Sequence, residues 1–367
     1  MPRKKSDIAA SKKRGIEHHR SISLKQLAAH VGLSPTTVSF VLNDSPLAST
    51  IPQETKDRIF DAARELNYRP NFLARSLRTQ RSYTIGVLVP EVSGGYTAGV
   101  MNGIEEYLLE KGYFYIVASH RHKPELLDYY PKLFLDRCVE GIIGVDTPIH
   151  KPQLLPMVSV SGHEDIKGVT NIVLDHQKAA ELAIEYIVRM GHQQLAVIKG
   201  QAFSSDTQVR WDTLSNAAKQ HNIRINPQLV SSLEGDSPSP EIGYQAAKKL
   251  LAAGNPFSAV FAFNDISAIG AISAFREAGF RVPEDISVIG FDDIDSASFH
   301  NPPLTTIRQP LRRMGWYAAE TLLDRITKGA DFHYPEILTV EPKLIIRQST
   351  AAAPANGAMK KIRARGR

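Results

Sequence analysis

The sequence contains very little cysteine: Cys138 is the only one among 367 residues. A single cysteine excludes a disulfide framework and a zinc site built from cysteines. No stretch approaches about 18 uninterrupted apolar residues, so no membrane-spanning helix is predicted. No apolar segment precedes Ser21, and the sequence therefore shows no secretory signal. We expect a soluble cytoplasmic protein, and 43% hydrophobic and 22% charged residues are typical of a globular chain with two or three domains.

The motifs of common enzyme classes are also missing. No GxGxxG follows a predicted strand, no GxxxxGK precedes Ser or Thr, and no GxSxG occurs, which argues against nucleotide cofactors and a serine nucleophile. The twelve histidines show no HExxH or similar metal-ligand spacing. His192 lies in the turn after a predicted helix and is interpreted as structural. We expect a protein that is not an enzyme and that holds no cofactor or metal.

The net charge of +6 is distributed unevenly. Residues 1–82 hold 15 Lys and Arg against 7 Asp and Glu, and residues 351–367 hold 5 Lys and Arg with no acid. Residues 83–350 hold 24 Lys and Arg against 31 Asp and Glu. Basic ends on an acidic body indicate that the ends meet a polyanion; the alternative is that they only aid solubility. Residues 1–22 and 351–367 lack apolar periodicity, so a disordered basic arm and a disordered basic tail are predicted.

Residues 83–350 alternate between short apolar runs and amphipathic helical stretches. The predicted strands are 84–89, 113–118, 141–145, 157–160, 171–174, 195–198, 259–263 and 286–291. The predicted helices are about 99–111, 124–136, 176–190, 207–221, 241–253 and 265–278. Continuous apolar strands alternating with helices indicate parallel sheets covered on both faces. Nearly 270 residues is large for one such sheet, so two doubly wound α/β subdomains with a cleft between them are expected.

Three short helical patterns fill residues 23–68, which form a predicted small domain. Ser23 and Gln26 have the spacing of a capping box at the start of a helix over 24–31. Gly32 then suits the left-handed conformation that ends many helices. The first helix is therefore bounded on both sides by local signals.

A second helix over 35–43 begins after the N-cap Ser34, with a proline at its first position, where no backbone N–H is needed. Two short helices joined by this turn make a helix-turn-helix. The exposed face of the second helix carries short hydroxyl groups and one ring that suit base edges in the major groove: Thr36, Thr37, Ser39 and Phe40. A purely structural hairpin is the alternative, but the basic surroundings favour DNA binding.

A third helix is predicted over 53–67, and four of its side chains are expected to pack on the first two helices: Ile59, Phe60, Ala63 and Leu66. Residues 69–82 then form a hinge segment in which Asn71 is a good N-cap. A hinge helix of about seven residues is too short to persist alone in water, so it would form against a partner helix and DNA.

Three segments resemble the lactose-repressor (LacI/GalR) family of bacterial transcription regulators: LKQLAAHVGLSPTTVSFVLN, ETKDRIFDAARELNYRPNFLARSLRTQRSYTIGVLVP, and DISVIGFDDIDSASFHNPPLTTIRQP at 285–310. The similarity covers about 22–349, with the segments in the family's order. It implies a repressor that binds a pseudo-palindromic double-stranded DNA operator as a homodimer, with a small effector controlling operator affinity. It does not say whether the effector releases DNA or promotes binding, nor which genes are controlled.

The resemblance places the DNA contacts on the second helix and in the hinge. Many members carry Arg or His at the position of Phe40, which reads a base by hydrogen bonds, whereas a phenyl ring can contact a thymine methyl. Leu77 matches the side chain that wedges between base pairs in the minor groove, with a core leucine as the alternative. The loop 44–50 is a few residues longer than in better-known members. The implied DNA-binding residues are Ser34, Pro35, Thr36, Thr37, Ser39, Phe40, Asn43, Asn71, Leu77 and Arg78.

The family body is similar to periplasmic sugar-binding proteins, with a ligand between two subdomains joined by three crossovers. Here it implies one subdomain of about 83–175 and 310–338, and another of about 176–309 and 339–350. Ligands in such sheets lie outside the carboxyl ends of strands. The residues that match the family pocket, or follow a strand, are Tyr96, Arg210, Asn264, Asp265 and Asp292.

Each pocket residue has a structural alternative. Asp292 and Arg210 can form an interdomain salt bridge instead, Asn264 and Asp265 can cap a helix, and Tyr96 can be an ordinary interface aromatic. Arginine and carboxylate groups that face one another suit vicinal hydroxyls. The family resemblance therefore leaves a choice between ligand contacts and structural contacts at these positions.

Several positions depart from better-known members, so neither a lactose-like sugar nor a purine can be carried over as effector. Ser161 stands where Asp is frequent, Ser204 replaces an arginine, and 236–241 lacks a pocket aromatic. A sugar or related polyhydroxy compound is the expected class. Three alternative functions are disfavoured. An enzyme lacks its motifs, and a transport binding protein lacks a signal sequence. An architectural DNA protein would have no use for the large body with its cleft. Residues 351–367 lack leucine heptads, which argues against a tetramerisation bundle.

Overall fold

The computed structural model separates into two compact units, Met1–Arg81 and Ser82–Arg367, called here the head and the body and treated separately. It describes residues 22–43, 45–69, 76, 81–236, 239–329 and 333–354. Three of the expected DNA contacts, Asn71, Leu77 and Arg78, lie outside the described residues. So do 1–21 of the predicted arm and 355–367 of the predicted tail.

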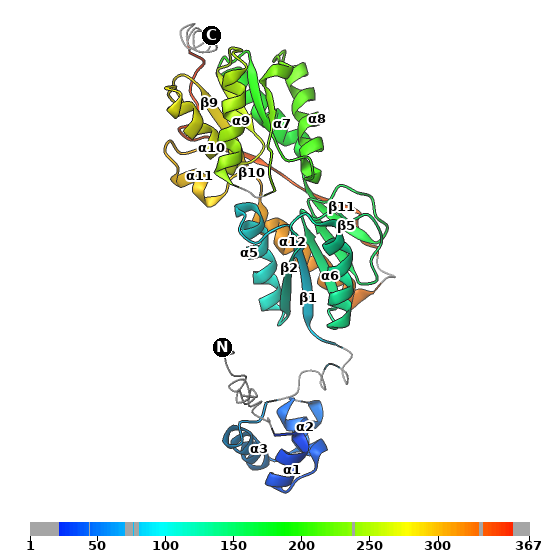
Figure 1. Ribbon diagram of the computed structural model, residues 1–367. Coiled ribbons are helices and arrows are strands. Elements are labelled where there is room, and N and C mark those ends of the chain that lie inside the picture. The colour runs from blue at the N-terminus through cyan, green and yellow to red at the C-terminus, as the bar shows by residue number, and fades with distance from the viewer. Residues whose placement is uncertain are drawn as a thin grey trace, which may run out of the picture. The chain divides into compact units, whose positions relative to one another are not determined.

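The head is built from helices (Figure 1). They are α1 (Leu24–Val31), α2 (Pro35–Leu42), the 3₁₀ helix η1 (Pro46–Thr50) and α3 (Gln53–Glu65). The longer loop expected over 44–50 therefore contains a 3₁₀ turn, which begins after Ser45. The predicted second and third helices each end one or two residues earlier than expected.

The predicted capping signals of the head are confirmed. The Ser23 backbone N–H donates to the Gln26 side chain at 2.8 Å, and Ser23 Oγ accepts from the Gln26 N–H in return. Gly32 ends α1 with a φ of 68°, which costs glycine nothing. Ser34 Oγ accepts a 3.0 Å hydrogen bond from the Thr37 N–H, and α2 starts there. These hydrogen bonds satisfy backbone donors that the first turn of a helix leaves free.

The core of the head is small and differs in two places from expectation. Leu27, Val38 and Ile59 are fully buried at its centre. Phe60, predicted to pack inward, is 43% exposed, because the helix turns Ala62 rather than Phe60 toward α1 and α2. Ile22, assigned to the disordered arm, packs against this core.

The body contains two six-stranded sheets. The first has the order β11-β5-β4-β3-β1-β2, with β1 (Thr84–Val89), β2 (Phe114–Ser119), β3 (Gly141–Val145), β4 (Met157–Val160), β5 (Val169–Leu174) and β11 (Ile337–Val340). The second has the order β12-β10-β9-β8-β6-β7, with β6 (Leu195–Lys199), β7 (Val230–Ser232), β8 (Ala259–Ala262), β9 (Ser287–Asp292), β10 (Thr305–Arg308) and β12 (Lys343–Ile345). All pairings are parallel except that of β10 with β12.

Helices pack against the faces of both sheets, and each sheet with its helices is called a lobe (Figure 1). The first lobe has α5 (Gly95–Glu110), α6 (Pro124–Asp136) and α12 (Leu311–Lys328). The second has α7 (His176–Arg189), α8 (Ser205–Gln220), η2 (Pro227–Leu229), α9 (Pro240–Ala252), α10 (Asp265–Glu277) and α11 (Asp295–Phe299). The predicted fold class, a helical head and two doubly wound α/β subdomains, is confirmed.

The chain passes between the lobes three times: after β5, after β10 and after β11. The last passage comes later than expected, since Thr339 and Val340 pair with Val173 and Leu174 and so belong to the first sheet. The carboxyl ends of the strands of both sheets lead into the loops between the lobes, and this arrangement positions the cleft described below.

The first lobe is held together by a close crossing of α5 and α12. A Cβ at Gly103 would lie 1.8 Å from the Arg312 carbonyl oxygen, and one at Gly315 would lie 1.9 Å from that of Val100. Only glycine permits this backbone approach. The crossing joins the N-terminal and C-terminal parts of the lobe, which lie over 200 residues apart in the chain.

The start of the predicted tail is ordered. The Ala353 N–H donates to the Met190 carbonyl at 2.7 Å, and the Ala351 carbonyl accepts from His192 Nε2 at 3.1 Å. His192 is buried, and its Nδ1 lies 2.8 Å from Ser258 Oγ. The prediction of disorder from 351 is wrong at these residues, because backbone and imidazole partners fix them. The structural interpretation of His192 agrees with these contacts.

Candidate functional site

The exposed face of α2 is the candidate DNA-binding face of the head. Pro35 and Thr36 are exposed at its first turn. The Thr37 hydroxyl lies 2.8 Å from Ser34 Oγ, so these two side chains hold each other in place. One hydroxyl at the first turn is thus engaged within the head, whereas Thr36 is available on its surface.

The second turn of α2 presents Ser39, Phe40 and Asn43. Asn43 Nδ2 donates to the Ser39 carbonyl at 2.7 Å and lies 3.2 Å from its hydroxyl, which stabilises the end of the helix. Phe40 is partly exposed and does not belong to the described core cluster of the head. The ring therefore lies on the exposed face of α2, where it can contact a molecule bound to the head.

In the body, a cleft of about 110 Å³ lies between the lobes. Its lining comes from the carboxyl ends of strands, the loops that follow them and the first turns of the next helices, as expected for parallel sheets. Residues from the first lobe include Glu91, Tyr96, His122 and Asp146; residues from the second include Gln201, Ser204, Asp206, Arg210, Asp236, Phe263, Asn264 and Asp292. The cleft thus holds five carboxyl groups and one guanidinium among its described lining residues.

Asp292, the last residue of β9, is buried in this cleft and accepts a 2.7 Å hydrogen bond from Gln309 Nε2. Burial raises the pKa of its carboxyl to about 7, although Arg210 opposes the shift. Its φ of 110° is unusual for a residue with a side chain. The structure therefore turns this carboxyl into the cleft at a cost in backbone conformation.

Asp146 follows β3 and contributes a half-buried carboxyl from the first lobe. Burial raises its pKa to about 7 as well, and the nearby charge of Asp206 adds to the shift. Ser204 Oγ of the second lobe lies 3.5 Å from its Oδ1. Sequence reasoning missed Asp146, although its place directly after a buried strand was a usable signal.

Arg210 is buried on α8, and its guanidinium carbon lies 3.7 Å from the centre of the Phe291 ring. Its Nη2 donates to Asp206 Oδ2 at 3.0 Å, and its Nη1 donates to the Phe263 carbonyl. The ion pair is therefore formed within one helix and one lobe, not with Asp292. The interdomain salt bridge that the sequence left as an alternative is absent from these described contacts.

Tyr96 is the second residue of α5 rather than part of the preceding loop. It lines the cleft, and its hydroxyl lies 2.5 Å from Ser161 Oγ. Burial, followed by the charge of Asp206, raises its pKa well above the usual value. Its hydroxyl is thus held by the first lobe, and the ring forms part of the cleft wall.

Asn264 and Asp265 differ in position. Asn264 caps α10 by accepting from the Ser267 N–H at 2.8 Å, and it also lines the cleft. Asp265 is fully buried beneath the cleft and is not among its lining residues. Its carboxylate accepts from Thr306 Oγ1 at 2.6 Å and from the Ile294 N–H at 2.9 Å. Asp265 therefore joins β10 and the β9–α11 loop to α10 and is not part of the described cleft lining.

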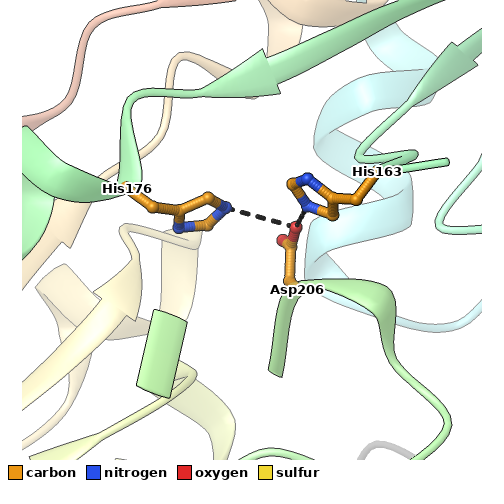
Figure 2. Close-up of side chains that lie close together, drawn as sticks. All are labelled: His163, His176 and Asp206. Atoms are coloured by element: carbon orange, nitrogen blue, oxygen red, sulfur yellow. Dashed lines mark hydrogen bonds and ion pairs between the residues drawn. The ribbon is translucent and has the colours of Figure 1, made fainter. Parts of the chain in front are cut away.

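A cluster of three side chains that the sequence did not single out lies beside the cleft (Figure 2). Asp206 Oδ1 is 2.6 Å from His163 Nε2 and 3.3 Å from His176 Nε2. Burial alone would raise the pKa of Asp206, but hydrogen bonds from both imidazoles and the charge of Arg210 hold it below its usual range. No short sequence motif links these residues, so only the fold could bring them together.

Comparison with known proteins places the two parts of the chain. Residues 23–71 match the family model of bacterial regulatory proteins of the lacI family, and residues 184–350 match a periplasmic binding protein-like domain. The HTH-type transcriptional repressor PurR of Pasteurella multocida is 33% identical over 89% of this chain and 98% of its own length. PurR of Aliivibrio fischeri is 33% identical over 90% of this chain and 98% of its own length.

Solved structures give the same assignment. The lac repressor dimer bound to operator and an anti-inducer superposes with a TM-score of 0.81 and 27% identity, covering 91% of this chain and all of that one. The complex of the regulator CelR with cellobiose has a TM-score of 0.64 and 26% identity, covering 89% of this chain and 99% of that one. Among the described helices, none is long and apolar enough to span a membrane.

A helix-turn-helix head on a periplasmic-binding-protein-like body defines a class of DNA-binding transcriptional repressors. The chain belongs to the lacI family of bacterial regulatory proteins. Its relatives are repressors, which agrees with the lack of enzyme motifs in the sequence.

Proposed function

We propose that the body is a sensor for a neutral polyhydroxy compound of the sugar class, and that its binding in the cleft changes the affinity of the head for operator DNA. The observation that carries the proposal is the pair Asp146 and Asp292, one carboxyl from each lobe in the same cleft. A ligand held between them contacts both lobes at once. It therefore favours one arrangement of the lobes over another, which is the basis of allosteric control.

The charges of the cleft support a neutral ligand with many hydroxyl groups. Carboxylates accept hydrogen bonds from hydroxyls, and Arg210 and Asn264 offer donors to their oxygens. An anionic ligand such as a sugar phosphate would face five carboxyl groups and one arginine. The cleft is also smaller than the roughly 300–1,000 Å³ of most ligand pockets, so a larger effector would require the lobes to separate.

The perturbed carboxyl groups give this proposal a measurable signature. With pKa values of about 7, Asp146 and Asp292 are each close to half protonated at neutral pH. A sugar hydroxyl that donates to a carboxylate favours the ionised form, so binding releases protons. Calorimetric enthalpies measured at pH 7 in phosphate and in Tris should therefore differ. The expected difference is the number of protons released multiplied by the difference between the ionisation enthalpies of the two buffers.

One relative of known structure was solved with a ligand of this class. CelR, solved with cellobiose, shares the fold and 26% of the aligned residues. The PurR repressors are more similar in sequence, at 33% identity. The family resemblance, however, implies departures from better-known members at pocket positions, Ser161 and Ser204 among them.

The test is a mobility-shift assay with operator DNA in the presence of neutral sugars, polyols, sugar phosphates and purine bases, followed by calorimetry with any compound that acts. We expect a neutral sugar or polyol to change the affinity for DNA. Asp292→Ala should abolish that response and leave basal DNA binding intact. Asp212→Ala, which removes an exposed carboxyl of α8 outside the cleft lining, is the matched control and should respond normally. A purine that acts, or normal effector binding by Asp292→Ala, would contradict the proposal.

The repressor is further proposed to act in the cytoplasm as a homodimer on a pseudo-palindromic operator. β2 is an edge strand of the first sheet, and it exposes 67% of Phe114. Leu109 on α5 is 62% exposed. Exposed apolar side chains along a sheet edge are typical of a covered interface. Phe114→Glu should shift the mass measured by analytical ultracentrifugation toward the monomer; an unchanged dimer would place the interface elsewhere.

A further inference from the structure

The cluster of His163, His176 and Asp206 has the composition of a metal site. His163 lies in the segment between β4 and β5, His176 is the first residue of α7, and Asp206 is the second residue of α8. Both imidazole rings point toward the Asp206 carboxylate (Figure 2). One possible ligand atom from each residue lies within 4.8 Å of the others. Two neutral imidazole nitrogens and one carboxylate oxygen are a ligand set that divalent transition ions accept.

The burial of the three groups also suits an ion. The side chains of His176 and Asp206 are 4% and 9% exposed, whereas that of His163 is 20% exposed. His163 lines a cavity of about 430 Å³, and Asp206 lines the effector cleft, so solvent reaches the cluster from both sides. Two ligands are thus fixed by the second lobe, and the third is at the surface where an ion would enter.

We propose that His163, His176 and Asp206 bind a divalent transition ion of the zinc class that links the two lobes. The first lobe supplies one ligand and the second lobe supplies two, so an ion bound to all three stabilises the arrangement in which the lobes meet. Water would complete a tetrahedral shell. The site is distinct from the effector contacts at Asp146 and Asp292, and it does not rest on the proposed effector class.

The nearby charges are compatible with a cation. Arg210 binds Asp206 through Oδ2, whereas both histidines approach Oδ1, so the carboxylate can bridge an ion and the guanidinium. Asp146 lies close enough to Asp206 for the two charges to repel each other, and a cation at Oδ1 would relieve that repulsion. In binding an ion, the histidines replace their hydrogen bonds to Asp206 with bonds to the metal.

The cluster can be tested with full-length protein stripped by a chelator and titrated with Co²⁺ or Zn²⁺. His18 and His19 are replaced by alanine throughout, because two adjacent histidines in the basic arm could bind these ions independently. We expect one Co²⁺ per chain with the visible absorption of a tetrahedral site, and a rise in melting temperature with Zn²⁺.

His163→Ala should lose the visible Co²⁺ absorption and weaken Zn²⁺ binding at least tenfold. His150→Ala is the matched control, since His150 is an exposed histidine of the same lobe that pairs with Glu164 at 2.7 Å. The control should bind both ions like the parent and melt like it without metal. Because His163→Ala also loses the hydrogen bond to Asp206, its melting temperature with Zn²⁺ is compared with its own value without metal, and no rise is expected. No tetrahedral absorption in the parent, or equal Zn²⁺ affinity in His163→Ala, would overturn the metal site and leave the effector proposal untouched.

Discussion

Asp292 makes the stability of the repressor depend on pH in a direction that can be calculated. Its carboxyl has a pKa of about 7 in the folded protein, against an ordinary value of 3.8, because it is buried. A carboxyl whose pKa is raised by folding holds its proton more tightly in the folded state. Stability from this group is therefore full below pH 3.8, falls as the pH rises toward 7, and stays low above 7.

The magnitude follows from the same values. Between pH 5 and pH 7 the carboxyl is ionised in the unfolded chain and protonated in the folded protein. Over this range each pH unit therefore lowers the free energy of unfolding by about 1.4 kcal/mol. The group thus removes about 3 kcal/mol of folding free energy between pH 5 and pH 8. Asp292→Asn cannot ionise, its amide oxygen can still accept from Gln309, and asparagine tolerates a positive φ better than most residues. The variant should escape this loss.

Thermal melting at pH 5 and pH 8 measures the effect. We expect Asp292→Asn to gain roughly 5 °C over the wild type at pH 8 relative to pH 5, from the scale for a domain of this size. Asp236→Asn removes an exposed carboxyl of the same cleft and should follow the wild type at both pH values. If both variants shift alike, or neither does, the carboxyl of Asp292 is ionised in the folded protein and the argument from burial is wrong.

Three further predictions concern other parts of the chain. Phe40→Arg should change the preferred base at one operator position from thymine toward guanine, by roughly 1–3 kcal/mol of binding free energy per half-site. Selection on randomised operators measures this preference, and the same selected sequences for both proteins would show that Phe40 does not read bases. Leu77→Ala should weaken specific operator binding by about a few kcal/mol and reduce DNA bending, and unchanged anisotropy titrations and bending would exclude the wedge. Gly103→Ala should lower the free energy of unfolding by about 1–3 kcal/mol or more, because the new Cβ would lie 1.8 Å from the Arg312 carbonyl oxygen. An unchanged midpoint in chemical denaturation would contradict the close crossing of α5 and α12.

Much of the head was predictable because its signals are local. The Ser23 and Gln26 capping box, the left-handed Gly32 and the Ser34 cap act through hydrogen bonds and φ values within a few residues. The sequence was a poorer guide to which helical side chains face the solvent. Phe60 was expected to be buried, but it is 43% exposed. A helix with apolar residues on more than one side does not reveal from its sequence which side packs against a small core.

In the body, most central strands and the edge strand β2 were predictable from the sequence, whereas β7, β10, β11 and β12 were not. β1, β3 and β9 are continuous apolar runs buried along their whole length. β7, β11 and β12 are only three or four residues long and partly exposed, so they carry no such run. These segments are strands because their backbone groups form hydrogen bonds with a neighbouring strand. The sequence of the segment alone does not show that neighbour.

The site divides in the same way. The sequence alone located Asp292, Asn264 and Arg210, since loops after parallel strands meet at one edge and the family motifs mark their positions. It could not tell that Arg210 pairs with Asp206, or that Asp265 lies beneath the cleft with its oxygens bound to Thr306 and Ile294.

The sequence by itself determined the helix starts of the head, the alternation of strands and helices in the body, and the sheet edge at which the cleft lies. These depend on spacing along the chain and on contacts over a few residues. The tertiary structure decided which charges face one another: it brings His163 of one lobe onto Asp206 of the other, and it places Asp146 near Asp206. Such pairings, and the pKa values they produce, arise from chain segments 40 or more residues apart, whose distances are set only when both sheets are packed.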